Sequence, residues 1–207
     1  MSTTQTSSSH GKLLVSVIAA AVVVVLALVS AFIWPGWALN EGSETAQVQQ
    51  VQQSESQSSE PTTPSIDAVA LPDDASELLK AMPDSVLNFA RTNAEASTSW
   101  SDASPLEEYT LTYSTGTDGQ EVTLVAAQWS QSDDAKTKYD ALASAMAGEE
   151  LGSGNVKVSG ETTGAYSVKT DPDDENKAIA LWQNGTVVFR ATGSTDSVQR
   201  FYQEFPL

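Results

Sequence analysis

An uncharged apolar run near the amino end constrains this chain more than any other feature. Residues Leu13–Trp34 read LLVSVIAAAVVVVLALVSAFIW, and the polar members of that run are Ser16 and Ser30. A helix needs roughly 20 mostly apolar residues, at about 1.5 Å of rise each, to cross the hydrocarbon core of a bilayer. The run is long enough, and no polar face interrupts it. We expect residues 13–37 to form a single transmembrane helix that follows a cytoplasmic tail over 1–12.

Residues beside the run predict its orientation. Lys12 precedes it, whereas Trp34 and Trp37 stand at its far end, where indole rings favour the headgroup region. All 27 acidic residues follow the run, and positive charge tends to stay inside the cell. We therefore expect Lys12, Trp34 and Trp37 at the membrane interfaces, and the rest of the chain outside the cytoplasm. The alternative is a signal peptide cleaved near Ala38, which would make the same part a secreted protein.

The remainder of the chain divides by composition. Residues 38–66 are rich in Ser, Gln, Glu, Thr and Pro. Such a segment buries too little apolar surface to offset the entropy lost on ordering, so we expect a disordered linker. Residues 67–207 are numerous enough to bury one core without disulfides, and the chain has no Cys. We expect them to form one extracytoplasmic domain.

Two segments of this domain share a pattern. Val122–Met146 and Thr186–Phe205 each contain an apolar strand, a Ser/Asp cluster and an amphipathic helix. Each helix follows a predicted hairpin, and the second hairpin turns at Asn184-Gly185, because both residues tolerate positive φ. We expect an α+β fold, with an antiparallel sheet, helices on one face and two ββα-like units. The repeat is either a duplication or convergent ββα patterning.

The inventory of reactive residues disfavours catalysis. The one histidine, His10, lies on the expected cytoplasmic side, and there is no cysteine. These facts exclude a Ser-His-Asp or Cys-His nucleophile from the exported domain. The formal net charge of −17 repels phosphate and disfavours nucleic acid as a partner. We predict a protein that is not an enzyme and has no cofactor. Hydrolysis of glycosides by paired carboxylates is the residual enzymatic alternative.

Three residues are candidates for ligand binding. Trp129 and Trp182 end predicted strands, where an indole can stack on a ligand or close a core. Arg190 lies on a predicted strand, where its guanidinium can hold a carboxylate or phosphate, or pair with an acid of the chain.

One acidic cluster is a candidate metal site. Asp171, Asp173 and Asp174 supply the hard oxygen ligands that calcium prefers. The cluster lacks the glycine and the distal glutamate of an EF-hand loop. Its alternative is a solvated turn between two strands, since Asp, Pro and Asn favour turns.

The overall layout is a short span, an acidic Ser/Thr-rich tether and a small domain that ends in ALWQNGTVVFRATGSTDSVQRFYQEFPL. This layout resembles that of uncharacterised membrane-anchored exported proteins of high-GC Gram-positive bacteria. The resemblance carries no catalytic motif and implies no role for any residue.

We therefore expect a membrane-anchored binding or accessory module of the cell envelope. It would contact the bilayer through residues 13–37 and an envelope protein or polymer through its domain. The alternative is a tethered carrier of a small molecule or lipid, which requires a cavity. The two hypotheses differ in whether strand residues such as Leu124, Val187 and Phe189 line a packed core or a void.

Overall fold

The computed structural model describes residues 60–207. The expected tail, the expected span and most of the linker lie outside this range, and so do Lys12, Trp34 and Trp37. Within 60–207, no helix combines the length and the apolar character that a membrane crossing requires.

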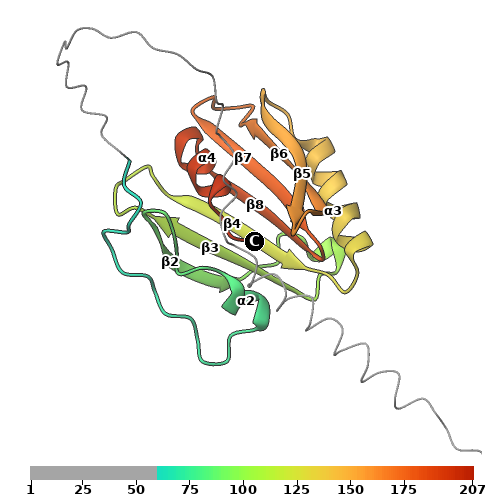
Figure 1. Ribbon diagram of the computed structural model, residues 1–207, viewed down its shortest axis with the longest axis horizontal. Helices are drawn as coiled ribbons and strands as arrows, with labels where there is room; N and C mark the ends of the chain where they lie inside the picture. The colour runs from blue at the N-terminus through green and yellow to red at the C-terminus, as the bar shows by residue number, and fades with distance from the viewer. Residues whose placement is uncertain (1–59) are drawn as a thin grey trace, which may run out of the picture.

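The described chain forms one eight-stranded sheet with α-helices packed on it (Figure 1). The strands are β1 (Ser85–Val86), β2 (Phe89–Ala96), β3 (Glu107–Ser114), β4 (Val122–Gln128), β5 (Glu150–Val158), β6 (Glu161–Thr170), β7 (Lys177–Asn184) and β8 (Val187–Ser194). The helices are α2 (Glu77–Ala81), the short 3-10 helix η1 (Ser101–Ala103), α3 (Ser132–Ala145) and α4 (Thr195–Gln203). Across the sheet the order is β1-β2-β3-β4-β8-β7-β6-β5, with every neighbouring pair antiparallel. The predicted α+β class with an antiparallel sheet is confirmed.

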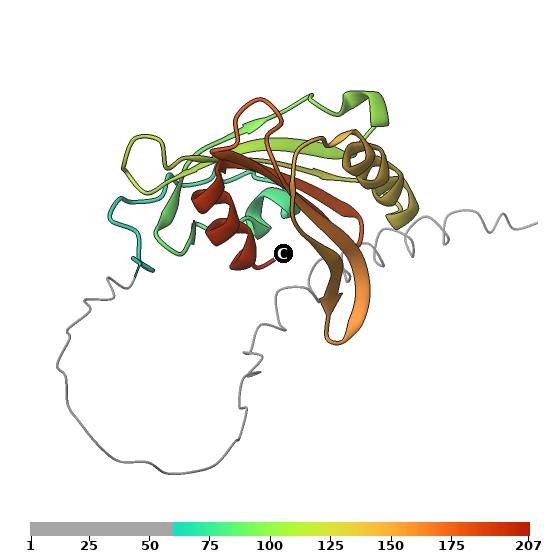
Figure 2. The ribbon, with the colours of Figure 1, turned by 90° about the horizontal axis from the view of Figure 1, so that it is seen from above.

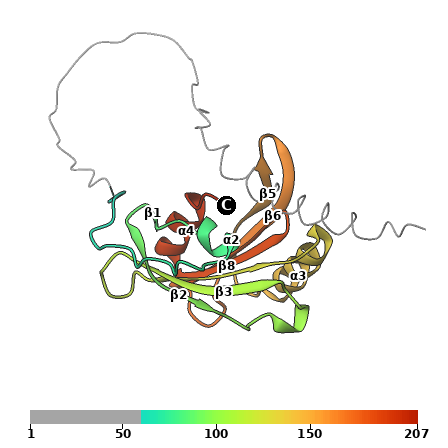
Figure 3. The same ribbon diagram turned by 90° about the horizontal axis from the view of Figure 1, so that it is seen from below.

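The prediction that the helices share one face of the sheet is wrong. The helices α2 and α4 lie on one face and α3 lies on the other (Figures 2 and 3). The reason is that β4 carries apolar residues at consecutive positions. Leu124 belongs to the core under α2 and α4, which we call the α4 core, and Val125 belongs to the core under α3, the α3 core. Because successive side chains of a strand point to opposite faces, both faces need a cover.

The two ββα units place their helices on opposite faces of the sheet. This difference favours a convergent ββα pattern over an internal duplication. Strands β4 and β8 are antiparallel neighbours, with β3 and β7 outside them. A rotation of half a turn about an axis perpendicular to the sheet, between β4 and β8, would therefore superpose the β3–β4 hairpin on the β7–β8 hairpin. That rotation keeps a helix on its original face, whereas α3 and α4 occupy opposite faces. Helix α3 instead packs across β7 and β8 and leads to the edge strand β5.

The second hairpin turns one residue later than predicted. Asn184 is the last residue of β7 and pairs with Val187, which leaves Gly185 and Thr186 as the loop. Gly185 has φ of 57°, and Asn184 has no positive φ. A glycine with positive φ at the first loop position is the type II′ pattern, which suits the twist of a hairpin. The shift keeps Asn184 in the strand, where its side chain is 4% exposed.

Arg91 of β2 ties the segment before the sheet to the sheet itself. Its side chain is 1% exposed. Nη1 donates to the carbonyl oxygens of Met82 and Pro83, at 3.1 and 2.9 Å. Nη2 donates to the carbonyl oxygen of Val69 at 3.1 Å and to Oδ1 of Asp84 at 2.7 Å. One guanidinium therefore hydrogen-bonds to the segment before α2 and to the segment after it.

Two tyrosines complete this attachment. Tyr113 Oη donates to the carbonyl oxygen of Pro83 at 2.9 Å, and burial raises the pKa of Tyr113, so the phenol keeps its proton. Tyr109 Oη donates to Ser76 Oγ at 3.1 Å. Ser76 also caps α2 by accepting the N–H of Leu79. The position of α2 on the sheet is thus set by side chains of β2 and β3.

Replacing Arg91 by Met should destabilise the fold strongly. The variant leaves the carbonyl oxygens of Met82 and Val69 without their side-chain donor and removes one of the two donors to Pro83, and each buried acceptor left unsatisfied costs about 1–3 kcal/mol. Unfolding of the full chain by urea in mild detergent, followed by near-UV circular dichroism, would measure the loss.

Lys136→Met is the matched control, because Lys136 pairs with Asp140 on an exposed helix surface. Its effect should stay below about 0.5 kcal/mol. Equal effects of the two substitutions would show that Arg91 does not anchor the segment.

Candidate functional site

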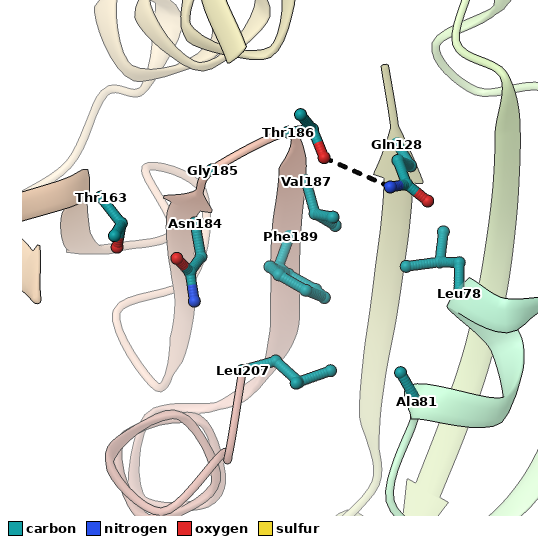
Figure 4. Close-up of a pocket in the computed structure, with 10 residues that line it drawn as sticks. All are labelled: Leu78, Ala81, Gln128, Thr163, Asn184, Gly185, Thr186, Val187, Phe189 and Leu207. Atoms are coloured by element: carbon teal, nitrogen blue, oxygen red, sulfur yellow. Dashed lines mark hydrogen bonds between the residues drawn. The ribbon is translucent and has the colours of Figure 1, made fainter. Parts of the chain in front are cut away.

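A pocket opens on the face of the sheet that carries α2 (Figure 4). Its empty volume is about 590 Å³, with open solvent at its mouth included. It lies between α2, the ends of β4 and β7, the start of β6 and β8, and the last residue of the sequence. The residues that line it are Leu78, Ala81, Gln128, Thr163, Asn184, Gly185, Thr186, Val187, Phe189 and Leu207.

Apolar side chains form most of the lining. Val187 and Phe189 project from β8, and α2 contributes Leu78 and Ala81 on the opposite side, with Leu207 between them (Figure 4). Val187 and Phe189, two of the strand residues expected to line either a void or a packed core, line this pocket and also belong to the α4 core, at 7% and 1% exposure. Leu124 is fully buried in the α4 core.

Polar groups without partners gather at one end of this pocket. Asn184 Oδ1 and Thr163 Oγ1 are both buried, and neither has a hydrogen-bond partner among residues 60–207. Figure 4 draws both side chains on the β6 and β7 side of the pocket, across from Leu78 and Ala81. A buried polar atom that makes no hydrogen bond costs about 1–3 kcal/mol. A bound group that donates hydrogen bonds to these oxygens would remove that cost.

The other polar lining residues are engaged with one another. Gln128 Nε2 donates to Thr186 Oγ1 at 3.2 Å, which joins the end of β4 to the β7–β8 loop (Figure 4). No lining residue has a titratable side chain. The pocket can therefore bind and orient a molecule through contact and hydrogen bonding, but its lining side chains supply no acid or base.

Trp182 does not line the pocket, which corrects its predicted role in ligand binding. Its side chain is 2% exposed and stacks on Phe189, with ring centroids 5.0 Å apart. Nε1 donates to the carbonyl oxygen of Leu207 at 3.0 Å. Trp182 thus positions two residues of the lining, because the indole closes the core beneath them.

Trp129 and Arg190 lie on the opposite face of the sheet and come together around Trp100. Trp129 is buried in the α3 core, stacks on Trp100 with centroids 6.4 Å apart, and donates from Nε1 to the carbonyl oxygen of Ala103 at 2.8 Å. The guanidinium carbon of Arg190 lies 5.5 Å from the centre of the Trp100 ring. Trp129 has a structural role, and the binding role of Arg190 stays a prediction.

The predicted calcium site is not formed. Asp171 Oδ1 accepts the N–H of Asp173 at 2.9 Å, and Asp174 Oδ1 accepts the N–H of Asn176 at 3.1 Å. The hydrogen bonds from Asn176 lower the pKa of Asp174. In the part of the chain that the structure describes, no three acidic or histidine side chains converge as metal ligands. These carboxylates brace the turn before β7, as turn-favouring residues do.

Sequence reasoning missed Asn184, Thr163 and Arg91. Asn184 carried a signal, since an Asn before Gly marked the hairpin, but the signal pointed to the turn rather than to a pocket. Thr163 and Arg91 carried none. Their roles depend on contacts with residues distant in the sequence, such as Val69 for Arg91.

Comparisons with known proteins add little to this geometry. No protein-family model matches the chain, and no curated protein matches it. A solved structure described as a GTP binding regulator from Thermotoga maritima is similar at a TM-score of 0.37 and 12% identity, over 57% of this chain and 78% of that one. At that distance we transfer neither fold nor function from it.

Replacing Gly164 by Ala should disturb the wall of the pocket beside Thr163. A Cβ at Gly164 would lie 1.9 Å from the carbonyl oxygen of Gln183, a backbone atom that cannot rotate away. Crowding of this kind costs about 1–3 kcal/mol. Thermal unfolding of the full chain in detergent should show the loss as a lower Tm.

Gly152→Ala is the matched control, because its Cβ would meet Tyr166 at an ordinary 3.9 Å. Its Tm should stay near that of the unmodified chain. If both substitutions lowered Tm alike, crowding against Gln183 would not be the cause.

Proposed function

We propose that this protein is a membrane-anchored extracytoplasmic binding module, and that the pocket beside Asn184 holds a small, largely apolar ligand. One observation supports this most: a pocket lined mainly by apolar side chains contains two buried oxygens without partners, Asn184 Oδ1 and Thr163 Oγ1. A convergent polar end in an apolar cavity is the usual form of a small-molecule site.

The lining specifies the class of ligand. An apolar group would contact Phe189, Leu78 and Leu207, and a hydroxyl or N–H at its end would donate to Asn184 and Thr163. The lining side chains carry no charge, so an ion would lose hydration without a compensating side chain. We infer a small neutral amphiphile. A protein that binds such a ligand without an acid or base in its site is a carrier or sensor rather than an enzyme.

The proposed location agrees with this chemistry. A span over 13–37 would hold the protein at the membrane, and the linker over 38–66 would let the domain reach on the order of 30 Å from it. A module in that zone would meet amphiphiles at the bilayer surface. Recognition of an envelope protein or polymer is the second possibility, in which an apolar group of the partner would enter the same pocket.

Replacing Asn184 by Leu should abolish ligand binding and raise the free energy of unfolding. The substitution removes a buried oxygen without a partner, so the empty fold should gain about 1–2 kcal/mol, while the ligand loses its acceptor. Native mass spectrometry of the full chain, released from membranes in mild detergent, would detect a bound mass that disappears on denaturation.

Two further variants make the result interpretable. Asn93→Leu changes the same residue type at an exposed strand position and should keep the bound mass. Ala81→Leu fills the pocket from α2 and should remove the bound mass without changing the polar end. A bound mass retained in both pocket variants would place the ligand elsewhere. The unmodified chain without any bound mass, together with a crosslinked envelope partner, would favour the second possibility.

A further inference from the structure

Arg190 differs from the other two arginines of the chain. Arg91 donates to four oxygen acceptors. Arg200 donates to Pro61 and Asn88 and pairs with Glu60. Arg190 forms no hydrogen bond and no ion pair with any residue in 60–207. Its Nε is buried without a partner, as Arg91 Nε also is, but the Nη atoms of Arg190 have no acceptor there either.

The surroundings of Arg190 remove water without supplying a hydrogen-bond acceptor. Its guanidinium lies over Trp100 and is partly buried, and this desolvation lowers the pKa of Arg190. Glu108 is the acid whose charge reaches it, but both Glu108 oxygens already accept hydrogen bonds, from Ser97 Oγ at 2.7 Å and from the N–H of Trp100 at 2.9 Å. A cation that has lost part of its hydration is costly unless an anion compensates for it.

The second cation near Trp100 is already neutralised. Lys138 Nζ lies 5.9 Å from the centre of the Trp100 ring and pairs with Asp102 at 3.2 Å. Arg190 is therefore the cation of this cluster that forms no hydrogen bond and no ion pair within the described chain, although the charge of Glu108 reaches it. Arg190 as a whole is partly exposed, and its Nη1 and Nη2 are not among the fully buried atoms without a partner.

The face of the sheet beside Arg190 carries polar, partly exposed side chains. Thr192 lies two residues along β8 and so shares the face of Arg190, and Thr123 pairs with Thr192 across β4. Both threonines are half-buried. This face lies on the side of α3, opposite to the α2 and α4 side that holds the pocket (Figure 3).

We propose that Arg190 binds the carboxylate of a small molecule that carries no other charge. The Nη1 and Nη2 N–H groups match the two oxygens of a carboxylate, a pairing that is stronger than a neutral hydrogen bond. The net charge of the chain favours a singly charged carboxylate over a more highly charged anion, because the chain has 27 acidic residues and 10 basic ones. A phosphate dianion or a polyanion would be repelled by that excess far more than a single carboxylate.

Titration of the full chain, labelled with ¹⁵N-arginine in detergent micelles, tests this site. The three arginines yield at most three Nε–Hε resonances, and Arg190→Gln identifies the one from Arg190. Propionate should shift that resonance along a saturating curve. It should leave the resonances of Arg91 and Arg200 unchanged, and its dissociation constant should be at least tenfold lower than that of inorganic phosphate.

Propionamide, which has the same shape without the charge, should cause no saturating shift. Lys157→Gln removes an exposed positive charge elsewhere and should leave the propionate titration unchanged. Parallel, unsaturating shifts of Arg190 and Arg200 would overturn the proposal, because they indicate a general ionic effect. Tighter binding of phosphate would overturn the assignment to a carboxylate. None of these outcomes depends on the pocket beside Asn184, which lies on the other face.

Discussion

The buried guanidinium of Arg91 is the interaction on which the arrangement of this domain depends. A sheet alone would leave the face of β2 and β3 open, because between residue 60 and β1 the chain contributes just five helical residues, those of α2. Such a helix is too short to be stable alone in water. Arg91, Tyr113 and Tyr109 hold it through hydrogen bonds to its flanking backbone and its cap. Because α2 supplies one wall of the pocket, the candidate site rests on this attachment.

The second constraint is that the middle of the sheet is apolar on both faces. Strands β4 and β8 pair in the centre, and their alternate residues feed the α4 core and the α3 core. Two helices on opposite faces satisfy this requirement, and α3 reaches its face by crossing β8 and β7 toward the edge strand β5. The arrangement separates the neutral pocket from the Arg190 cluster. The two ligands proposed above would therefore bind on opposite faces of the sheet.

The candidate pocket owes its polar end to a hairpin that turns at Gly185 and Thr186. Had both Asn184 and Gly185 formed the loop, the Asn184 amide would have been solvated. Instead Asn184 stays in β7, and its Oδ1 is buried without a partner. Natural proteins keep such unsatisfied groups mainly where a ligand, a water or a functional strain accounts for them. This is why the pocket, rather than the stacked tryptophans, carries the proposed function.

The sequence by itself determined the class of the fold, the hairpins and the approximate extent of the helices. These follow from local patterns: strict alternation in β3, the Gly185 turn, and apolar residues at helical spacing in α3 and α4. It also made Arg190 a candidate, since an arginine on a strand is conspicuous in so acidic a chain. The span and the linker remain predictions of the same kind, made from hydropathy and composition.

Tertiary structure alone decided on which face of the sheet each helix packs and which backbone groups Arg91 binds. It also decided that Asn184, Thr163 and Phe189 line the same pocket. It also placed Trp100 beneath Arg190 and moved Trp182 from a binding role to a packing role. The physical reason is one of range. Hydropathy periods and turn preferences act between residues a few positions apart. A buried hydrogen bond or a cavity depends on which distant segments pack together, and no local pattern encodes that choice.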